Sequence, residues 1–220
     1  MDQLVRELLD YRTGGRVLGR SSQRGVSLIE LVIGLVIVGL LVLIGAPSFA
    51  TFLQNSQIRN ASESIQNGLS LARSEAVRRN TEVTLSLSKT SAGADVANSS
   101  SWEVGCTTVS TNLTSCPADI QHRSYLEGSK NVTITNTVTG AAGATFATTG
   151  QLTFNGYGKV VGLPAANTAV IDIVTSVNGA TCAADGGAMR CLRLIVSPAG
   201  QVRMCDPALT LTNASSPQAC

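Results

Sequence analysis

Residues 24–47 read R-G-V-S-L-I-E-L-V-I-G-L-V-I-V-G-L-L-V-L-I-G-A-P. Within this stretch, Glu30 is the one charged residue after Arg24. A helix of about 20 apolar residues rises roughly 30 Å, which matches the hydrocarbon core of a bilayer. A secretory signal has a shorter apolar core and a small-residue cleavage site behind it, and residues 46–50, A-P-S-F-A, fit such a site poorly. The stretch is therefore predicted to be a retained membrane span.

The charge distribution predicts the orientation of that span. Residues 1–25 hold five arginines and three acidic residues, which account for the whole formal net charge of +2, so residues 26–220 are formally neutral. An excess of arginine before an apolar segment is typical of a cytoplasmic flank. We expect a single-pass protein of the cell inner membrane whose C-terminal domain is periplasmic. The neutral remainder also argues against nucleic-acid binding through overall charge.

Six cysteines all follow residue 100: Cys106, Cys116, Cys182, Cys191, Cys205 and Cys220. They can pair in fifteen ways, and the sequence does not choose among them. Short separations favour three local bridges, 106–116, 182–191 and 205–220. Disulfides persist in an oxidising compartment, which agrees with a periplasmic domain. No C-x-x-C spacing is present and His122 is the single histidine, so no metal site is predicted.

Apolar residues recur at helical spacing from Ser48 to Asn80. One stripe follows steps of three or four and consists of Ile58, Ala61, Ile65, Leu69, Ala72 and Ala76. We expect this stripe to pack on the chain's own domain, with the helix continuing through Pro47. Phe49, Phe52 and Leu53 precede the stripe and are predicted to contact lipid headgroups or a partner helix.

After Asn80 the apolar period changes to two, which indicates strands. Short runs of this kind are predicted at 81–87, 131–138, 151–154, 159–161, 169–175, 191–197 and 201–204. Residues 88–101 are predicted to be an exposed polar loop. The predicted fold class is α+β, with a long N-terminal helix packed on a C-terminal antiparallel β-domain. The expected organisation is a basic leader at 1–25, a transmembrane helix at 26–47, an amphipathic continuation at 48–80 and a β-domain at 81–220.

Residues 24–47 resemble the class III signal of type IV pilins and pseudopilins. The resemblance implies that a prepilin peptidase cuts between Gly25 and Val26 and methylates the new amine of Val26. The family usually has phenylalanine at that position, so valine is a departure. The family's fifth mature residue, a glutamate that assists subunit docking, matches Glu30, and its helix-melting glycine and proline match Gly39 and Pro47.

Further stretches are similar to the GspH/FimT group of that family. They are residues 67–80, N-G-L-S-L-A-R-S-E-A-V-R-R-N, then residues 102–105, 152–158 and 194–203. The group includes the secretion pseudopilin H and the minor pilins FimU and FimT. The resemblance implies a structural subunit that assembles with other pilins and with an inner-membrane assembly platform. It also implies a filament, a pilus or a pseudopilus, as the final location.

A carboxylate within a bilayer costs about 2.5–3.5 kcal/mol on insertion scales, so such residues are usually paired and functional. The implied cut would place a cationic amine one helical turn from Glu30. That amine can pair with Glu30 of the same subunit or, in a staggered bundle, with Glu30 of a neighbour. The alternative is that Glu30 lies near the cytoplasmic interface and reaches water there.

The soluble part offers no catalytic constellation and implies no cofactor. His122 has no nucleophile or ligand neighbour in sequence, and the Gly156-x-Gly158 turn precedes no helix, so a phosphate loop is not expected. The expected function is that of a minor pilin of a type IV pilus. The first alternative is the pseudopilin H of a type II secretion system.

A second alternative is a DNA receptor for uptake, as in FimT. The FimT subgroup carries a G-R-x-R signature, but the matching residues 200–203 read G-Q-V-R and lack one arginine. Arg190, Arg193 and Arg203 are the candidate DNA contacts. Three arginines in a charge-balanced domain more often form a solvated surface than a phosphate-binding site.

Overall fold

The computed structural model describes residues 25–89, 96–107, 116–139, 149–213 and 215–220. The proposed leader therefore lies outside the described residues, except for Gly25. The chain divides between Gly45 and Ala46 into two compact units. The first unit contributes the apolar part of helix α2, whose full extent is Leu28–Arg79.

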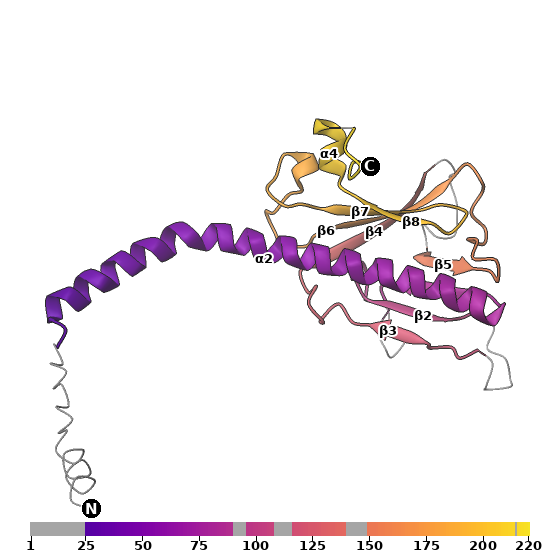
Figure 1. Ribbon diagram of the computed structural model, residues 1–220, viewed down its shortest axis with the longest axis horizontal. Coiled ribbons are helices and arrows are strands. Elements are labelled where there is room, and N and C mark those ends of the chain that lie inside the picture. Colours follow the sequence, from indigo (N-terminus) through magenta and orange to yellow (C-terminus); the bar gives the residue numbers. More distant parts are fainter. Residues whose placement is uncertain (1–24, 90–95, 108–115, 140–148, 214) are drawn as a thin grey trace, which may run out of the picture. The chain divides into compact units, whose positions relative to one another are not determined.

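The second unit contains two four-stranded antiparallel sheets (Figure 1). The first sheet has the order β3-β2-β1-β5, with β1 at Val83–Leu87, β2 at Trp102–Cys106, β3 at Gln121–Arg123 and β5 at Gln151–Phe154. The second has the order β4-β6-β7-β8, with β4 at Val132–Thr139, β6 at Thr168–Thr175, β7 at Leu192–Val196 and β8 at Val202–Cys205. A 3-10 turn, η1, spans Ala183–Asp185, and a short helix, α4, spans Pro207–Thr212.

One hydrophobic core joins both sheets to the second half of α2. The predicted helical stripe from Ile58 to Ala76 is at most 1% exposed, which confirms its role in the core. Alternation along β1 and β2 buries Val83, Leu85 and Val104 on the same side. Fully burying a side chain such as Leu or Ile stabilises a fold by about 1.5–3 kcal/mol, so the stripe is a main source of stability.

Trp102 is packed closely against the helix. Its indole Nε1 donates a buried hydrogen bond of 2.8 Å to the hydroxyl of Ser64. Gly68 permits the approach, because a Cβ there would lie 3.1 Å from the indole ring and 2.9 Å from Leu85 Cδ1. The single tryptophan of the chain thus contributes both apolar area and a satisfied polar group to the core.

The α+β fold class and most of the predicted strands are confirmed, but three expectations about the chain path were incomplete or wrong. Strands β2 and β3 and helix α4 were not among the predicted elements. Residues 159–161 form no strand beyond an isolated bridge between Phe154 and Val160. The run ends early because Gly162 adopts a φ of +73°, which turns the backbone out of the extended conformation.

Residues 88–101 were expected to form an exposed polar loop, and this expectation was wrong for residues 99–101. Ser99, Ser100 and Ser101 are buried, and each has a hydrogen-bond partner. Ser100 Oγ donates to Ser129 Oγ at 2.8 Å, and Ser101 Oγ accepts from the Tyr125 backbone N–H at 2.9 Å. Small hydroxyl side chains can enter a core when their polar atoms are satisfied, so a polar sequence does not by itself indicate exposure.

Candidate assembly helix and the groove beside α2

The first unit presents an apolar helix with no protein cover. Among the described residues, the segment Leu28–Ala46 alone is long and apolar enough to cross a membrane. Its mean hydropathy is 2.9, and its most apolar part has no buried residues. Its large side chains are 47–81% exposed in the isolated chain. Contiguous apolar surface on this scale requires lipid or partner helices.

The residues of the expected processing site lie just before this helix. Gly25 and Val26 are exposed and outside regular structure, and the first helical hydrogen bond runs from Leu31 N–H to Ser27 O at 3.1 Å. Glu30 occupies the first turn and is exposed. A carboxylate in the first turn is favoured by the helix dipole, which adds to any pairing with an amine.

The other two expected assembly residues also lie in α2. Gly39 is surrounded by open space, because a Cβ added there would meet nothing within 4 Å. Helix α2 continues through Pro47, as expected from the apolar pattern on either side. Phe49 and Phe52, at the start of the second unit, are 63% and 66% exposed, so they are free for lipid or a partner.

Three disulfides cross-link the second unit. They join Cys106 to Cys116, Cys182 to Cys191 and Cys205 to Cys220, with Cα–Cα distances of 5.8, 5.4 and 5.1 Å. These are the pairs that short sequence separation favours. The first bridge begins at the end of β2, the second encloses η1, and the third closes the segment that contains α4.

The three candidate DNA-contacting arginines all have internal partners. Arg190 pairs with the buried carboxylate of Asp206 at 3.0 Å, and Arg193 pairs with Asp172 at 2.6 Å. Arg203 donates to the backbone carbonyl of Ala219. Phosphate binding would have to compete with these contacts, so the structure offers no prepared cluster of free cations at this place.

A carboxylate at the end of α2 is held by two arginines. Glu75 Oε2 lies 2.6 Å from Arg78 and 2.7 Å from Arg79, and the Glu75 side chain is only 14% exposed. The hydrogen bonds from Arg78 and then Arg79 lower the pKa of Glu75 below its ordinary value of 4.5, against a smaller opposing effect of burial. The charged form therefore stabilises the folded state.

The Glu75→Gln variant tests this contribution through pH. The folded pKa is depressed, so the stabilisation is fully present above about pH 4.5 and is lost as the pH falls through the folded pKa. At pH 7 we expect the variant to melt about 2 °C lower, since such pairs contribute roughly 0.3–0.5 kcal/mol. Thermal melts in detergent should converge with those of the unchanged chain once the pH lies below the lowered folded pKa of Glu75.

Glu63→Gln is the matched control, because Glu63 forms a pair with Arg59 on the same helix but both side chains are well exposed, at 49% and 75%. We expect a smaller shift in melting temperature for this control. A Glu75→Gln difference that persists unchanged at low pH would contradict the assigned role of the carboxylate.

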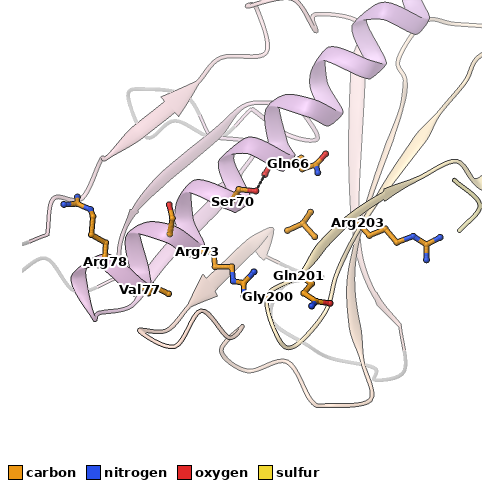
Figure 2. A pocket seen from close by; sticks show the side chains of 10 residues that line it. Gln66, Ser70, Arg73, Val77, Arg78, Gly200, Gln201 and Arg203 are labelled. Carbon is orange, nitrogen blue, oxygen red and sulfur yellow. Dashed lines mark hydrogen bonds between the residues drawn. The ribbon is translucent and has the colours of Figure 1, made fainter. Parts of the chain in front are cut away.

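A groove of about 880 Å³ runs between α2 and the β7–β8 hairpin (Figure 2). Gln66, Ser70, Arg73 and Val77 line it from the helix, and residues 200–203 line it from the hairpin. The side chain of Arg73 extends from the helix toward Gly200 in the close-up. Arg73 is not part of the apolar stripe in the sequence, and no local sequence pattern predicts this groove.

Two glycines make room for Arg73. Gly158 and Gly200 adopt φ values of +73° and +76°, and an added Cβ would lie 3.0 and 3.2 Å from Arg73 Nε, respectively. A Cβ on Gly200 would also overlap the carbonyl oxygen of Gly158. The two turns therefore meet beside the guanidinium. The sequence indicates the turn at Gly158, but the place where it meets the turn at Gly200 depends on the tertiary fold.

Comparison with known protein families shows what kind of chain this is. A family described as type II transport protein GspH matches residues 61–200, which is more than half of the chain. The chain belongs to the GspH family. The prokaryotic N-terminal methylation motif matches residues 20–46 of this GspH-family chain.

Among solved structures, the type IV minor pilin FimU of Pseudomonas aeruginosa strain PAO1 matches with a TM-score of 0.45 and 18% identity, over 77% of this chain and 98% of that chain. A second crystal form of FimU matches with a TM-score of 0.43 and 22% identity, over 74% and 98% of the two chains. The minor pseudopilin EpsH of the type 2 secretion system of Vibrio cholerae matches with a TM-score of 0.43 and 11% identity, over 69% and 98%. No curated protein matches the chain.

Family membership defines the general role of this GspH-family chain. It is a structural subunit of the pilin and pseudopilin type, not an enzyme. Such subunits assemble with other pilins into a filament. The methylation motif and the apolar helix together indicate membrane anchoring.

Proposed function

We propose that this GspH-family chain is a minor pilin that primes or caps a type IV pilus. The observation that carries the proposal is the uncovered apolar helix with Glu30 in its first turn. A helix of this kind is stable in a bilayer before assembly and in a bundle of similar helices after it. In this proposal the chain starts in the inner membrane with its β-domain periplasmic, is cut after Gly25, and then passes to the assembly platform.

The three disulfides favour a pilus over a secretion pseudopilus. A domain carried to the cell surface meets proteases and shear, and local cross-links limit its unfolding. The pseudopilin H of a type II secretion system is the second candidate, and the description of the matching family favours it. A DNA receptor is less favoured, because DNA phosphates would have to displace the internal partners of Arg190, Arg193 and Arg203.

Sheared surface filaments test the proposal directly. We expect the chain to appear in filaments sheared from intact cells, and we expect its deletion to reduce surface pili while extracellular enzyme secretion stays normal. Loss of secretion with normal pili would favour the pseudopilin instead. The unaltered parent strain and a strain complemented with the gene provide the controls.

Gly25→Ala tests the processing step. We expect the prepilin peptidase to approach the backbone closely before the cut, where glycine has no Cβ, so a Cβ at this position is expected to abolish nearly all processing. Intact-mass analysis of the purified chain should then show residues 1–25 retained and no methyl group on Val26.

Gly34→Ala is the matched control, because it adds the same methyl group to a glycine with open space around it in the same unit. The control should be cut normally. A mature mass for Gly25→Ala equal to that of the unchanged chain would place the cut elsewhere.

A further inference from the structure

Strand β8 is an edge strand with backbone groups directed away from its sheet. The Ser197 N–H donates to Gln201 O across the β7–β8 turn, at 3.0 Å, and the Asp206 N–H donates to Gln218 O, at 2.7 Å. Backbone groups of successive residues in an antiparallel strand point alternately to either side. Val202 and Met204 therefore direct their N–H and C=O groups to the same side as Asp206, away from β7.

The far end of this edge already pairs with another part of the chain. Asp206 forms an isolated parallel bridge with Ala219 of the chain itself. Val202 and Met204 make no hydrogen bond to that side within the part of the chain that the structure describes. An open edge beside a pairing that has already formed is a template for one more strand.

Arg73 supplies a charge beside this open edge. Arg73 and Val202 line the same groove. The groove's other two arginines are engaged, Arg78 with Glu75 and Arg203 with the Ala219 carbonyl. Arg73 has neither a hydrogen bond nor an ion pair among the described residues, although it is only partly exposed. A half-buried free guanidinium favours a carboxylate from a partner.

We propose that an extended segment of a neighbouring filament subunit adds to the β8 edge and places a carboxylate against Arg73. Main-chain hydrogen bonds to Val202 and Met204 would supply affinity, and the ion pair with Arg73 would select an acidic residue at one position. The identity of the partner as a filament subunit rests on the proposed function. Binding of a peptide to the groove does not depend on it, so the two ideas can fail separately.

The chemistry of the groove favours a peptide over nucleic acid. The open edge alternates donors and acceptors, which complements another peptide backbone, whereas a phosphate chain offers acceptors only. Nucleic-acid affinity also depends on several cations acting together, and here a single guanidinium is free in the groove. The occupant is therefore a short extended peptide with one central acidic residue.

The test uses the full chain in detergent micelles and the capped peptide T-V-T-E-T-V-T as a probe. NMR titration should shift the Val202 and Met204 amides and the Arg73 Nε–H in a saturable way. Replacing the peptide's glutamate by glutamine should weaken binding about tenfold. Arg73→Gln should remove that discrimination, so that both peptides bind equally weakly.

Val202→Pro tests the main-chain hydrogen bonds of the β8 edge independently of Arg73. Proline removes a donor that points away from β7 and is tolerated on edge strands, so the fold should persist by circular dichroism while peptide binding falls. Equal affinity for the acidic and amide peptides, or no shifts at millimolar peptide, would overturn the proposal. A single-stranded oligonucleotide that shifts Arg73 when the peptide does not would also overturn it and would favour nucleic acid.

Discussion

Gly200→Ala is expected to lower the melting temperature of the detergent-solubilised chain by about 10 °C. Two costs combine at this position. The φ of +76° costs an L-residue roughly 1–2 kcal/mol, and the new Cβ would overlap the Gly158 carbonyl oxygen. Relieving that overlap requires backbone movement in two turns, which typically costs a further 1–3 kcal/mol. For a chain of this size 1 kcal/mol corresponds to about 2–4 °C.

Gly162→Ala is the matched control for that substitution. Its φ of +73° is nearly the same, but an added Cβ would meet nothing within 4 Å. The control should therefore show the conformational cost alone, with a fall of about 3–5 °C. Equal melting temperatures for the two variants would show that the turns do not meet as described. Circular dichroism melts at one detergent concentration are sufficient for the comparison.

Glu30→Ala is expected to reduce incorporation into sheared filaments at least tenfold while leaving processing and membrane attachment intact. A carboxylate at membrane depth is costly unless it is paired, and the methylated amine of an incoming subunit is the proposed partner. Loss of one charge pair in a low-dielectric setting readily exceeds 1.4 kcal/mol, which corresponds to tenfold in an equilibrium. Quantitative blotting of sheared and membrane fractions measures both quantities.

Glu30→Gln separates the charge from the shape of the side chain. We expect this isosteric variant to fail nearly as severely as the alanine variant, because it cannot pair with an amine through a charge. Glu127→Gln, an exposed acid near Arg123 in the second unit, should assemble normally. Normal filament incorporation of Glu30→Ala would instead support the alternative in which Glu30 reaches water at the interface.

Periodicity in the sequence predicted the parts of the fold that depend on one element at a time. The stripe from Ile58 to Ala76 could be recognised because every third or fourth residue is apolar, and each of these residues is buried. Strand β1 followed from alternation between apolar and polar residues. The cysteine pairing agreed with the short separations of 9 to 15 residues.

The parts that sequence reasoning missed depend on contacts between distant segments. Strand β2 contains a glutamate and a glycine among its five residues, so its alternation is weak, although Trp102 and Val104 are buried. Ser100 is buried because Ser129 satisfies its hydroxyl, and no local pattern predicts that partner. The groove requires α2 and two glycine turns at one place, which only the tertiary fold provides.

The stripe of α2 has a mechanical consequence for a filament under tension. Because one helix carries both the assembly segment and the core stripe, any pull on the helix reaches the β-domain through side chains from Ile58 to Ala76. These positions span about 27 Å along the axis. A load along the axis is shared by all of them at once as shear and does not peel them apart one by one.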